Sequence, residues 1–453
     1  MGWRRVALGI CVWLVAACTP EATTPISDPP PAGPVVTTSQ ASGTVSNESG
    51  GPSSVDTTAA TASGSSSNCP PPAGKEWEVS ATSDLRRIHE REDGLTVDLA
   101  EYPLPPYEGK PWSQWGQGAY VEGRFFSAVG DHFGVDGNSF FYVLEEGVLA
   151  RISDVLSHTT HQPGEFGYGK VHAQMVAGSC GEVYAHTYWG TRRGLEYGDG
   201  YQGDLLFSLV PGTVEMLGVT APERGTASMA GSPDGRLLFL EAVTVENDTQ
   251  LVVYDTWERR VIDAVIDPLH TGRRALAVAA DGRVLYSSGE GDLTAYDPLQ
   301  GTVAETGVAL PGRMLRAVTT PTPGGDLIGV TTDPDEFFVL EASGELRRLG
   351  PAPAYTASLA LAPGGERVYF IPGAHGSAWE MGTPLMALDP VNGEQTIVVE
   401  LAEMVAEATG LRAGGTYNLV MDPDGSRIFI GINAGEGEES FGRVLLVVVG
   451  LPR

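Results

Sequence analysis

The chain has 453 residues, among them 59 glycines and 32 prolines. So many turn-forming residues are typical of an all-β protein. Its 57 acidic and 28 basic side chains give a net charge of −29 at neutral pH, which argues against nucleic acid and anionic lipid headgroups as partners.

Residues 1–18 are predicted to be an export signal that takes no part in the fold. Arg4 and Arg5 precede an apolar run over residues 6–15. The run ends in the letters VAAC, which resemble the bacterial lipobox, whose cysteine receives a diacylglycerol. The resemblance implies a lipoprotein held by membrane lipid through Cys18 in the bacterial cell envelope, either periplasmic or on the outer surface. An ordinary secretory signal cut near Ala17 and an uncleaved anchor are the alternatives.

Residues 19–74 are predicted to form a disordered tether. They are mainly Thr, Ser, Pro, Gly and Ala, with no Lys, Arg or aromatic residue. Such a segment cannot bury enough surface to offset its ordering entropy. Two cysteines remain outside the signal, Cys69 and Cys180, and in an exported protein two such cysteines usually pair. We therefore predict a Cys69–Cys180 disulfide and one folded domain over residues 75–453.

One short pattern recurs through the domain: a tight turn followed by an apolar strand. The clearest copy is SPDGRLLFL at residues 232–240. Proline presets φ for an early turn position, aspartate bonds to nearby backbone, and glycine accepts a positive φ. The seven turn glycines are Gly123, Gly181, Gly235, Gly282, Gly325, Gly365 and Gly425.

The spacing of these turns predicts a β-propeller. It runs from 40 to 60 residues, and one four-stranded blade takes about 40–50 residues. We expect seven blades of four antiparallel strands, with six or eight blades left open because the first two copies are weak. The last unit ends after its third strand, so one of the extended runs at residues 76–81 and 95–102 is expected to close the ring. A tandem of β-sandwiches is the alternative.

The repeats resemble those of the YVTN and quinoprotein-like propellers. The resembling residues are the PDGR turn at 233–236 and the DPxxG turns at 297–301 and 389–393. Together with their copies they extend over most of residues 230–450. The Gly-His and Trp-Asp dipeptides of WD40 repeats do not occur, and the Trp-docking motifs of quinone-binding relatives are missing. Pyrroloquinoline quinone is therefore not expected.

The propeller topology predicts where a binding site would lie. If the first strand of each blade is innermost, the links between blades and the loops after each second strand emerge at one end of the ring, the loop end. The glycine turns emerge at the other end, the turn end. Long loops fall in blades 1, 2, 6 and 7, which are consecutive in a ring. The link into blade 7 has apolar residues at helical spacing over 401–408, which predicts a short helix over these loops.

Candidate residues gather at this loop end. Four could serve as general acids or bases: His172, His186, His375 and Tyr188. Others could bind a ligand through aromatic, amide or guanidinium groups: Trp115, Gln117, Gln174, Trp189, Arg192, Arg193, Arg224, Arg273, Arg274, Arg313, Arg316, Tyr355, Trp379, Tyr417 and Asn418. For any single residue the plain structural alternative is an ion pair with a neighbouring acid, or packing within its loop.

These residue types favour a binding protein for a small anionic or carbohydrate-like molecule. Arginine pairs with carboxylates and phosphates, and aromatic rings stack against sugars. The alternatives are a lyase or hydrolase, or a protein-interaction scaffold. The His, Tyr and Arg set loosely resembles propeller lyases acting on uronates or cyclic lactones, which often use a divalent metal. No catalytic or cofactor motif occurs, so no cofactor is predicted, a divalent metal is left open, and a monomer is expected.

Overall fold

The computed structural model describes residues 69, 71, 73–104, 109, 112–131, 136–188, 200–244, 249–265, 275–287, 290–353 and 355–452. These residues belong to one compact unit that spans Ser65–Arg453. Six of the candidate residues lie outside the described ranges: Cys18, Trp189, Arg192, Arg193, Arg273 and Arg274.

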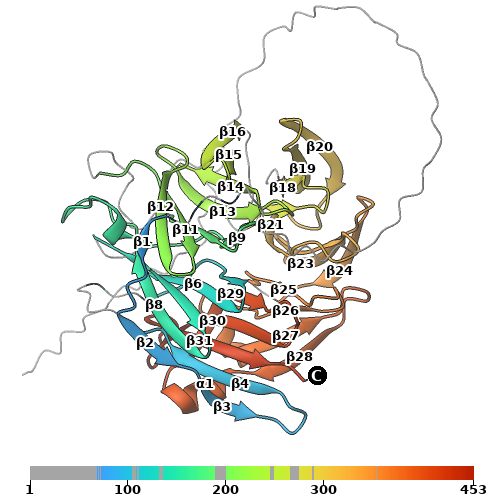
Figure 1. The fold of residues 1–453 in the computed structure, drawn as a ribbon. Coiled ribbons are helices and arrows are strands. Elements are labelled where there is room, and N and C mark those ends of the chain that lie inside the picture. Colours follow the sequence, from blue (N-terminus) through green and yellow to red (C-terminus); the bar gives the residue numbers. More distant parts are fainter. Residues whose placement is uncertain are drawn as a thin grey trace, which may run out of the picture. The chain divides into compact units, whose positions relative to one another are not determined.

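The described strands form seven sheets, so the prediction of a seven-bladed β-propeller is confirmed (Figure 1). The inner strands of blades 1 to 4 contact one another in turn, as do those of blades 6 and 7, and the inner strand of blade 7 contacts that of blade 1. The strands of blades 1 to 3, from the centre outward, are β5 (Ala119–Val121), β6 (Arg124–Gly130), β7 (Ser139–Glu145) and β8 (Val148–Asp154); β9 (Val176–Ala177), β10 (Val183–His186), β11 (Leu205–Val210) and β12 (Thr213–Val219); β13 (Gly225–Gly231), β14 (Leu237–Val243), β15 (Thr249–Asp255) and β16 (Arg260–Val265).

The remaining blades follow the same antiparallel order. Blades 4 to 7 consist, from the centre outward, of β17 (Ala277–Val278), β18 (Val284–Ser287), β19 (Asp292–Asp297) and β20 (Thr302–Ala309); β21 (Met314–Val318), β22 (Leu327–Thr332), β23 (Glu336–Leu340) and β24 (Leu346–Pro351); β25 (Ala360–Leu361), β26 (Val368–Phe370), β27 (Pro384–Leu388) and β28 (Gln395–Glu400); β29 (Arg412–Met421), β30 (Arg427–Gly435), β31 (Arg443–Gly450) and β4 (Thr96–Glu101).

The repeated turns have the backbone that their sequence demands. All seven turn glycines have positive φ, between +71° and +92°. At the clearest copy the amide of Gly235 donates to the carbonyl of Ser232 at 2.8 Å, and Oδ1 of Asp234 accepts from the amide of Arg236 at 3.1 Å. Only glycine takes this φ without strain, which is why the repeat keeps it.

The N-terminal segment closes the ring, as predicted. Strand β4 pairs antiparallel with β31, Leu99 opposite Val447, and so supplies the outer strand that the last blade lacks. In Figure 1 this blue strand lies against the red C-terminal one. Between blades 7 and 1, the rings of Phe125 and Phe429 stack with centroids 5.1 Å apart. Apolar packing thus joins blade 7 to blade 1.

Three blades have five strands, one more than the sequence predicted. Strand β3 (Arg86–Glu90) adds to β4 of blade 7, β2 (Ala81–Asp84) to β8 of blade 1, and β1 (Lys75–Glu76) to β12 of blade 2. One segment therefore runs along the outer edges of three consecutive blades. Just before it, a disulfide joins Cys69 to Cys180 in the turn of blade 2, with the two Cα atoms 5.8 Å apart.

Three short helices complete the described structure. The predicted helix in the link into blade 7 is α1 (Ala402–Thr409), and its buried Val405 belongs to the core of blade 7. It packs against β29 and the outer strand β3. The other two are 3-10 turns, η1 (Leu156–His158) and η3 (Ala378–Met381). Within the described ranges, no helix is both long enough and apolar enough to span a membrane.

Candidate functional site

A cluster of aromatic side chains lies at the loop end of the ring. Trp115, in the link before the inner strand of blade 1, is its centre. Its ring lies 5.0 Å from that of Tyr417 on β29, 5.8 Å from that of His375, and 5.7 Å from that of Phe441, against which it stacks. These residues come from blades 1, 7 and 6, so ring closure brings them together. We call this group, with Trp112 and Tyr355, the loop-end cluster.

Two members of the cluster share a hydrogen bond that places a titratable ring beside a hydroxyl. Nδ1 of His375 lies 2.6 Å from Oη of Tyr417. Tyr417 is 1% exposed, whereas the side chain of His375 is half-buried and reaches solvent. The pair is therefore anchored on its tyrosine side and accessible on its histidine side.

Tyr355 packs on the same pair from the link into blade 6. Its ring centroid lies 5.5 Å from that of His375 and 6.2 Å from that of Tyr417. Its φ of +54° is a left-handed backbone that bulky residues avoid, and such strained residues concentrate at functional sites. Its amide donates to Oδ2 of Asp335 at 3.3 Å, which helps to hold the strained backbone.

Two cations lie over the rings of this end. Nζ of Lys170 is 4.4 Å from the ring centroid of Trp115 and 5.2 Å from that of Tyr188. The guanidinium of Arg316 is 4.8 Å from the centroid of Tyr355. Within the described part of the chain, no carboxylate lies within ion-pair distance of Arg316. Cation–π contact orients each charge over its ring face.

The three candidate histidines have different surroundings. His172 is buried beside Tyr188, with ring centroids 4.8 Å apart, and its Nδ1 lies 2.7 Å from the carbonyl oxygen of Ala227. His186 is 1% exposed, and its Nε2 lies 2.9 Å from Oγ1 of Thr220. Burial lowers the pKa of His186 to about 4, so at neutral pH it is an uncharged, hydrogen-bonded core residue. Only His375 is both in the loop-end cluster and half-exposed.

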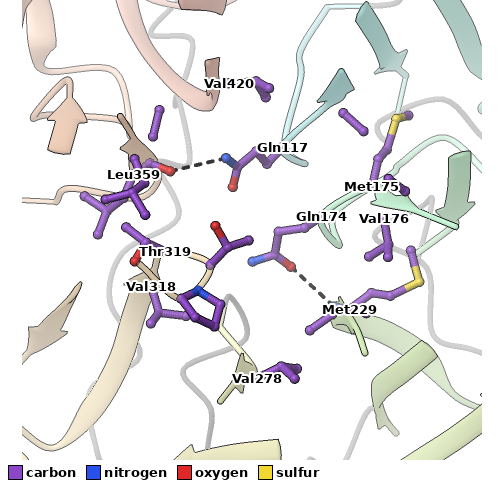
Figure 2. Close-up of a pocket in the computed structure, with 18 of the residues that line it drawn as sticks. Gln117, Gln174, Met175, Val176, Met229, Val278, Val318, Thr319, Leu359 and Val420 are labelled. Atoms are coloured by element: carbon purple, nitrogen blue, oxygen red, sulfur yellow. Dashed lines mark hydrogen bonds between the residues drawn. The ribbon is translucent and has the colours of Figure 1, made fainter. Parts of the chain in front are cut away.

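The remaining described candidates divide between the cavity, the core and the surface. Gln117 and Gln174 line a central cavity (Figure 2). Asn418 is fully buried, and it accepts from the amide of Gly118 at 2.7 Å and donates to Gln114 at 3.0 Å, joining blade 7 to blade 1.

The arginines and the last tryptophan of the set lie further out. Arg313 is exposed, 3.7 Å from Glu290. Nε of Arg224 is buried and has no hydrogen-bond partner among the described residues. The guanidinium of Arg412 covers the ring of Trp379 at 3.6 Å. None of these side chains contacts the loop-end cluster through an interaction between described residues.

Sequence reasoning missed two residues of this end. Trp112 packs edge-on against Trp115, with centroids 5.9 Å apart, and Arg412 covers Trp379. The signal for Trp112 was its spacing of three residues from Trp115 within an aromatic link. Arg412 begins β29, and nothing in its local sequence marks it as a partner of a loop in blade 6.

The described residues form no cluster of three or more His, Cys, Asp or Glu side chains that could hold a metal ion. What the loop end offers instead is two oriented cations, several ring faces, and one histidine–tyrosine pair. Such a set can bind an anion by charge-assisted hydrogen bonds and a flat or sugar-like ring by stacking.

Comparison with known proteins bears on the fold. No protein-family model matches the sequence, and no curated protein matches it either. The solved structures that resemble this one include a catalytically inactive virginiamycin B lyase from Staphylococcus aureus with quinupristin, and the selenomethionine-substituted enzyme from the same organism. Each is 12% identical with a TM-score of 0.48, and they cover 78% and 79% of this chain and 99% of their own. This likeness concerns the fold and carries no argument about a ligand.

Proposed function

We propose that this protein binds a small carboxylated, carbohydrate-like molecule at the loop end of its propeller, and that it does so as an exported protein tethered to a membrane. The observation that carries the proposal is one continuous series of contacts: Lys170 over Trp115, Trp115 against the His375–Tyr417 pair, that pair against Tyr355. Arg316 over Tyr355 ends the series.

The chemistry of the series suits a ligand with both a negative group and an apolar ring face. Lys170 and Arg316 can donate to a carboxylate, and charge-assisted hydrogen bonds are about twice as strong as neutral ones. The half-exposed rings of Tyr355 and Phe441 offer faces for stacking. Trp115 and Tyr417 are buried, at 6% and 1% exposed, and they pack against Tyr355, His375 and Phe441. This packing restrains the residues that would contact the ligand, which lowers the entropy cost of binding.

Electrostatics make the site selective. The whole chain has a net charge of −29, so a free anion is repelled by most of the surface. Lys170 and Arg316, one at each end of the series of ring contacts, reverse that repulsion only where the ligand docks. Binding should therefore weaken as salt is added, because exposed charges are screened over about 8–10 Å at physiological ionic strength.

The test is a calorimetric titration of the full-length protein with short galacturonate oligomers and with neutral galactose oligomers of equal length. We expect only the acidic oligomers to bind, with the affinity falling about 10-fold in Lys170→Gln and in Arg316→Gln. Lys75→Gln on β1 and Arg283→Gln in the turn of blade 4 remove the same charges elsewhere and should bind as the parent does. Equal binding of neutral oligomers, or equal losses in the control variants, would contradict the proposal.

The membrane tether is supported by the signal-like residues 1–18 and by the Cys69–Cys180 disulfide, because such bonds persist in oxidising compartments. Cell fractionation tests it. The full-length protein should sediment with membranes and resist salt extraction, and Cys18→Ser should lose its lipid mass. An unchanged mass in that variant would show that Cys18 carries no lipid.

The His375–Tyr417 pair favours one alternative, an acid–base elimination at the same site. One member would remove the proton from the carbon beside a uronate carboxylate, a carbon–carbon double bond would form, and the glycosidic carbon–oxygen bond would break as the leaving oxygen is protonated. An ultraviolet-absorbing unsaturated product that His375→Ala abolishes would establish it. If the parent protein binds the acidic oligomers but forms no product, the elimination is excluded and only the binding function remains.

A further inference from the structure

The centre of the ring contains a second concave site, separate from the loop-end cluster. It has a volume of about 670 Å³ and is lined by the inner strands of all seven blades. Its lining extends from Gln117 and Gln174 to Ser232 and Pro233 in the glycine turn of blade 3. The cavity therefore reaches the turn end, opposite to the proposed carbohydrate site.

Blades 2 to 7 each contribute an apolar side chain to the labelled lining in Figure 2, and blade 1 contributes Gln117. Met175, Met229, Val278, Val318 and Val420 direct side chains around the same space. A concave surface of this kind is stabilised when an apolar ligand displaces its water, by about 25 cal/mol per Å² of apolar area covered. The volume lies within the range of about 300–1,000 Å³ that is typical of small-molecule sites.

No described residue that lines the cavity is an Asp, Glu, Lys, Arg or His. This is notable in a chain with 57 acidic and 28 basic side chains. A charged ligand would lose its hydration there and gain no opposite charge, which is strongly unfavourable. The cavity therefore suits an uncharged ligand, whereas the loop end suits an anion.

Several polar residues line the cavity, namely Gln117, Gln174, Ser232, Thr319 and Thr320, and the contacts of Gln117 fix the direction of its amide. Nε2 of Gln117 donates to the carbonyl oxygens of Leu419 at 2.7 Å and Leu359 at 3.4 Å. Both of its amide hydrogens are thereby engaged with blades 6 and 7, and its Oε1 points into the cavity (Figure 2). An oxygen held in this way accepts a hydrogen bond from a ligand without any rearrangement of its own side chain.

We infer that the central cavity binds a neutral, largely apolar molecule that ends in a hydrogen-bond donor, such as a hydroxyl or an amide N–H. The apolar part contacts the methionine and valine side chains, and the donor meets Oε1 of Gln117. This site is distinct from the proposed carbohydrate site in position, charge and ligand class.

Photo-crosslinking of the full-length, membrane-bound protein tests the inference. The probe is a long-chain alcohol with a diazirine in its alkyl chain, compared with its methyl ether and with the carboxylate of equal length. Peptide mapping should find the alcohol on inner-strand peptides such as those of β9, β13 and β21. Labelling there should fall about 10-fold for the ether, which lacks the donor, and further for the carboxylate.

Cavity-filling variants give the matched comparison. Val318→Phe and Val176→Phe each add a ring to the cavity and should reduce inner-strand labelling by at least about 10-fold, whereas Val303→Phe on the exposed outer strand β20 should not change it. Labelling of the inner strands that is equal for alcohol and carboxylate, or that persists in both filled variants, overturns the inference. Labelling by the carboxylate that is confined to loop-end peptides agrees with the inference, because it shows that the carboxylate binds at the carbohydrate site and not in the cavity.

Discussion

At the turn end of the ring, seven turns of related sequence give seven glycines nearly the same φ, from +71° to +92°. At the loop end, the cluster around Trp115 draws its residues from links, loops and an inner strand of blades 1, 6 and 7, without a motif that repeats from blade to blade. The repeated end determines how blades form, whereas the unrepeated end can vary its side chains without disturbing a strand. Binding chemistry on a propeller is therefore expected where the repeat is least regular.

The largest effect should come from the centre of the loop-end cluster. Trp115→Ala removes a 6% exposed side chain that contacts Tyr417, His375 and Phe441, and we expect a loss of about 3–5 kcal/mol in the free energy of unfolding. Denaturant titration measures it. Trp257→Ala, in the partly exposed outer turn of blade 3, should cost about 1 kcal/mol. Equal losses would mean that the cluster is no better packed than the surface.

The disulfide separates stability from binding. Replacing Cys69 and Cys180 together by serine releases a loop of 111 residues and should lower the free energy of unfolding by about 2–4 kcal/mol. Galacturonate affinity should not change, because both cysteines lie away from the loop-end cluster. Loss of affinity in a folded double variant, checked by circular dichroism, would show that the two ends are coupled.

Acid should weaken the fold through a residue of blade 2. Burial lowers the pKa of His186 from 6.5 to about 4, so between these pH values the unfolded chain binds a proton that the folded chain does not. The free energy of unfolding therefore has its full value, as far as His186 is concerned, above about pH 6.5, and it falls by up to about 3 kcal/mol toward pH 4.

Unfolding curves of the parent and of His186→Gln across this pH range provide the measurement. In the variant, the free energy of unfolding should lose most of its dependence on pH over this range. His158, whose pKa is also lowered, by burial and then by Lys75, should leave a smaller remainder. An unchanged pH dependence of stability in the variant would contradict the assignment to His186.

The smallest expected effect concerns the seam between blades 7 and 1. Asn418→Ala leaves the amide of Gly118 and the side chain of Gln114 without their buried partner, which should cost about 1–3 kcal/mol. Asn392→Ala, in an exposed turn of blade 6, removes one hydrogen bond to the amide of Glu394 and should cost less. Thermal unfolding of the two variants decides between a seam that needs its polar contacts and one held by apolar packing alone.

The fold followed from the sequence because one strong local signal was repeated. The PDG turn at 233–235 and its copies specify backbone shape and strand spacing together. The extra strands β1 and β2 could not be foreseen. They are two and four residues long, mostly polar and partly exposed, so no alternation of apolar side chains marks them.

The candidate site was harder to predict, since its parts meet only through ring closure. His375 and Tyr417 are 42 residues apart in the chain, and nothing local to either predicts a hydrogen bond between them. Asn418 follows Tyr417 directly, yet it is buried in the seam because neighbouring strand residues point to opposite sides. The sequence predicts at which end of the ring these residues lie, and tertiary contacts determine which of them meet there.

Closure by β4 also determines when folding can finish. Leu99 pairs with Val447, so the strand that completes the last blade is synthesised, and in an exported chain translocated, almost a whole domain before its partner. Individual blades can form from local hairpins as they emerge, but the ring cannot close until the C-terminal strand arrives. Folding therefore needs one contact of very long range, and until β31 is made, the edge of β4 that will pair with it lacks its partner strand.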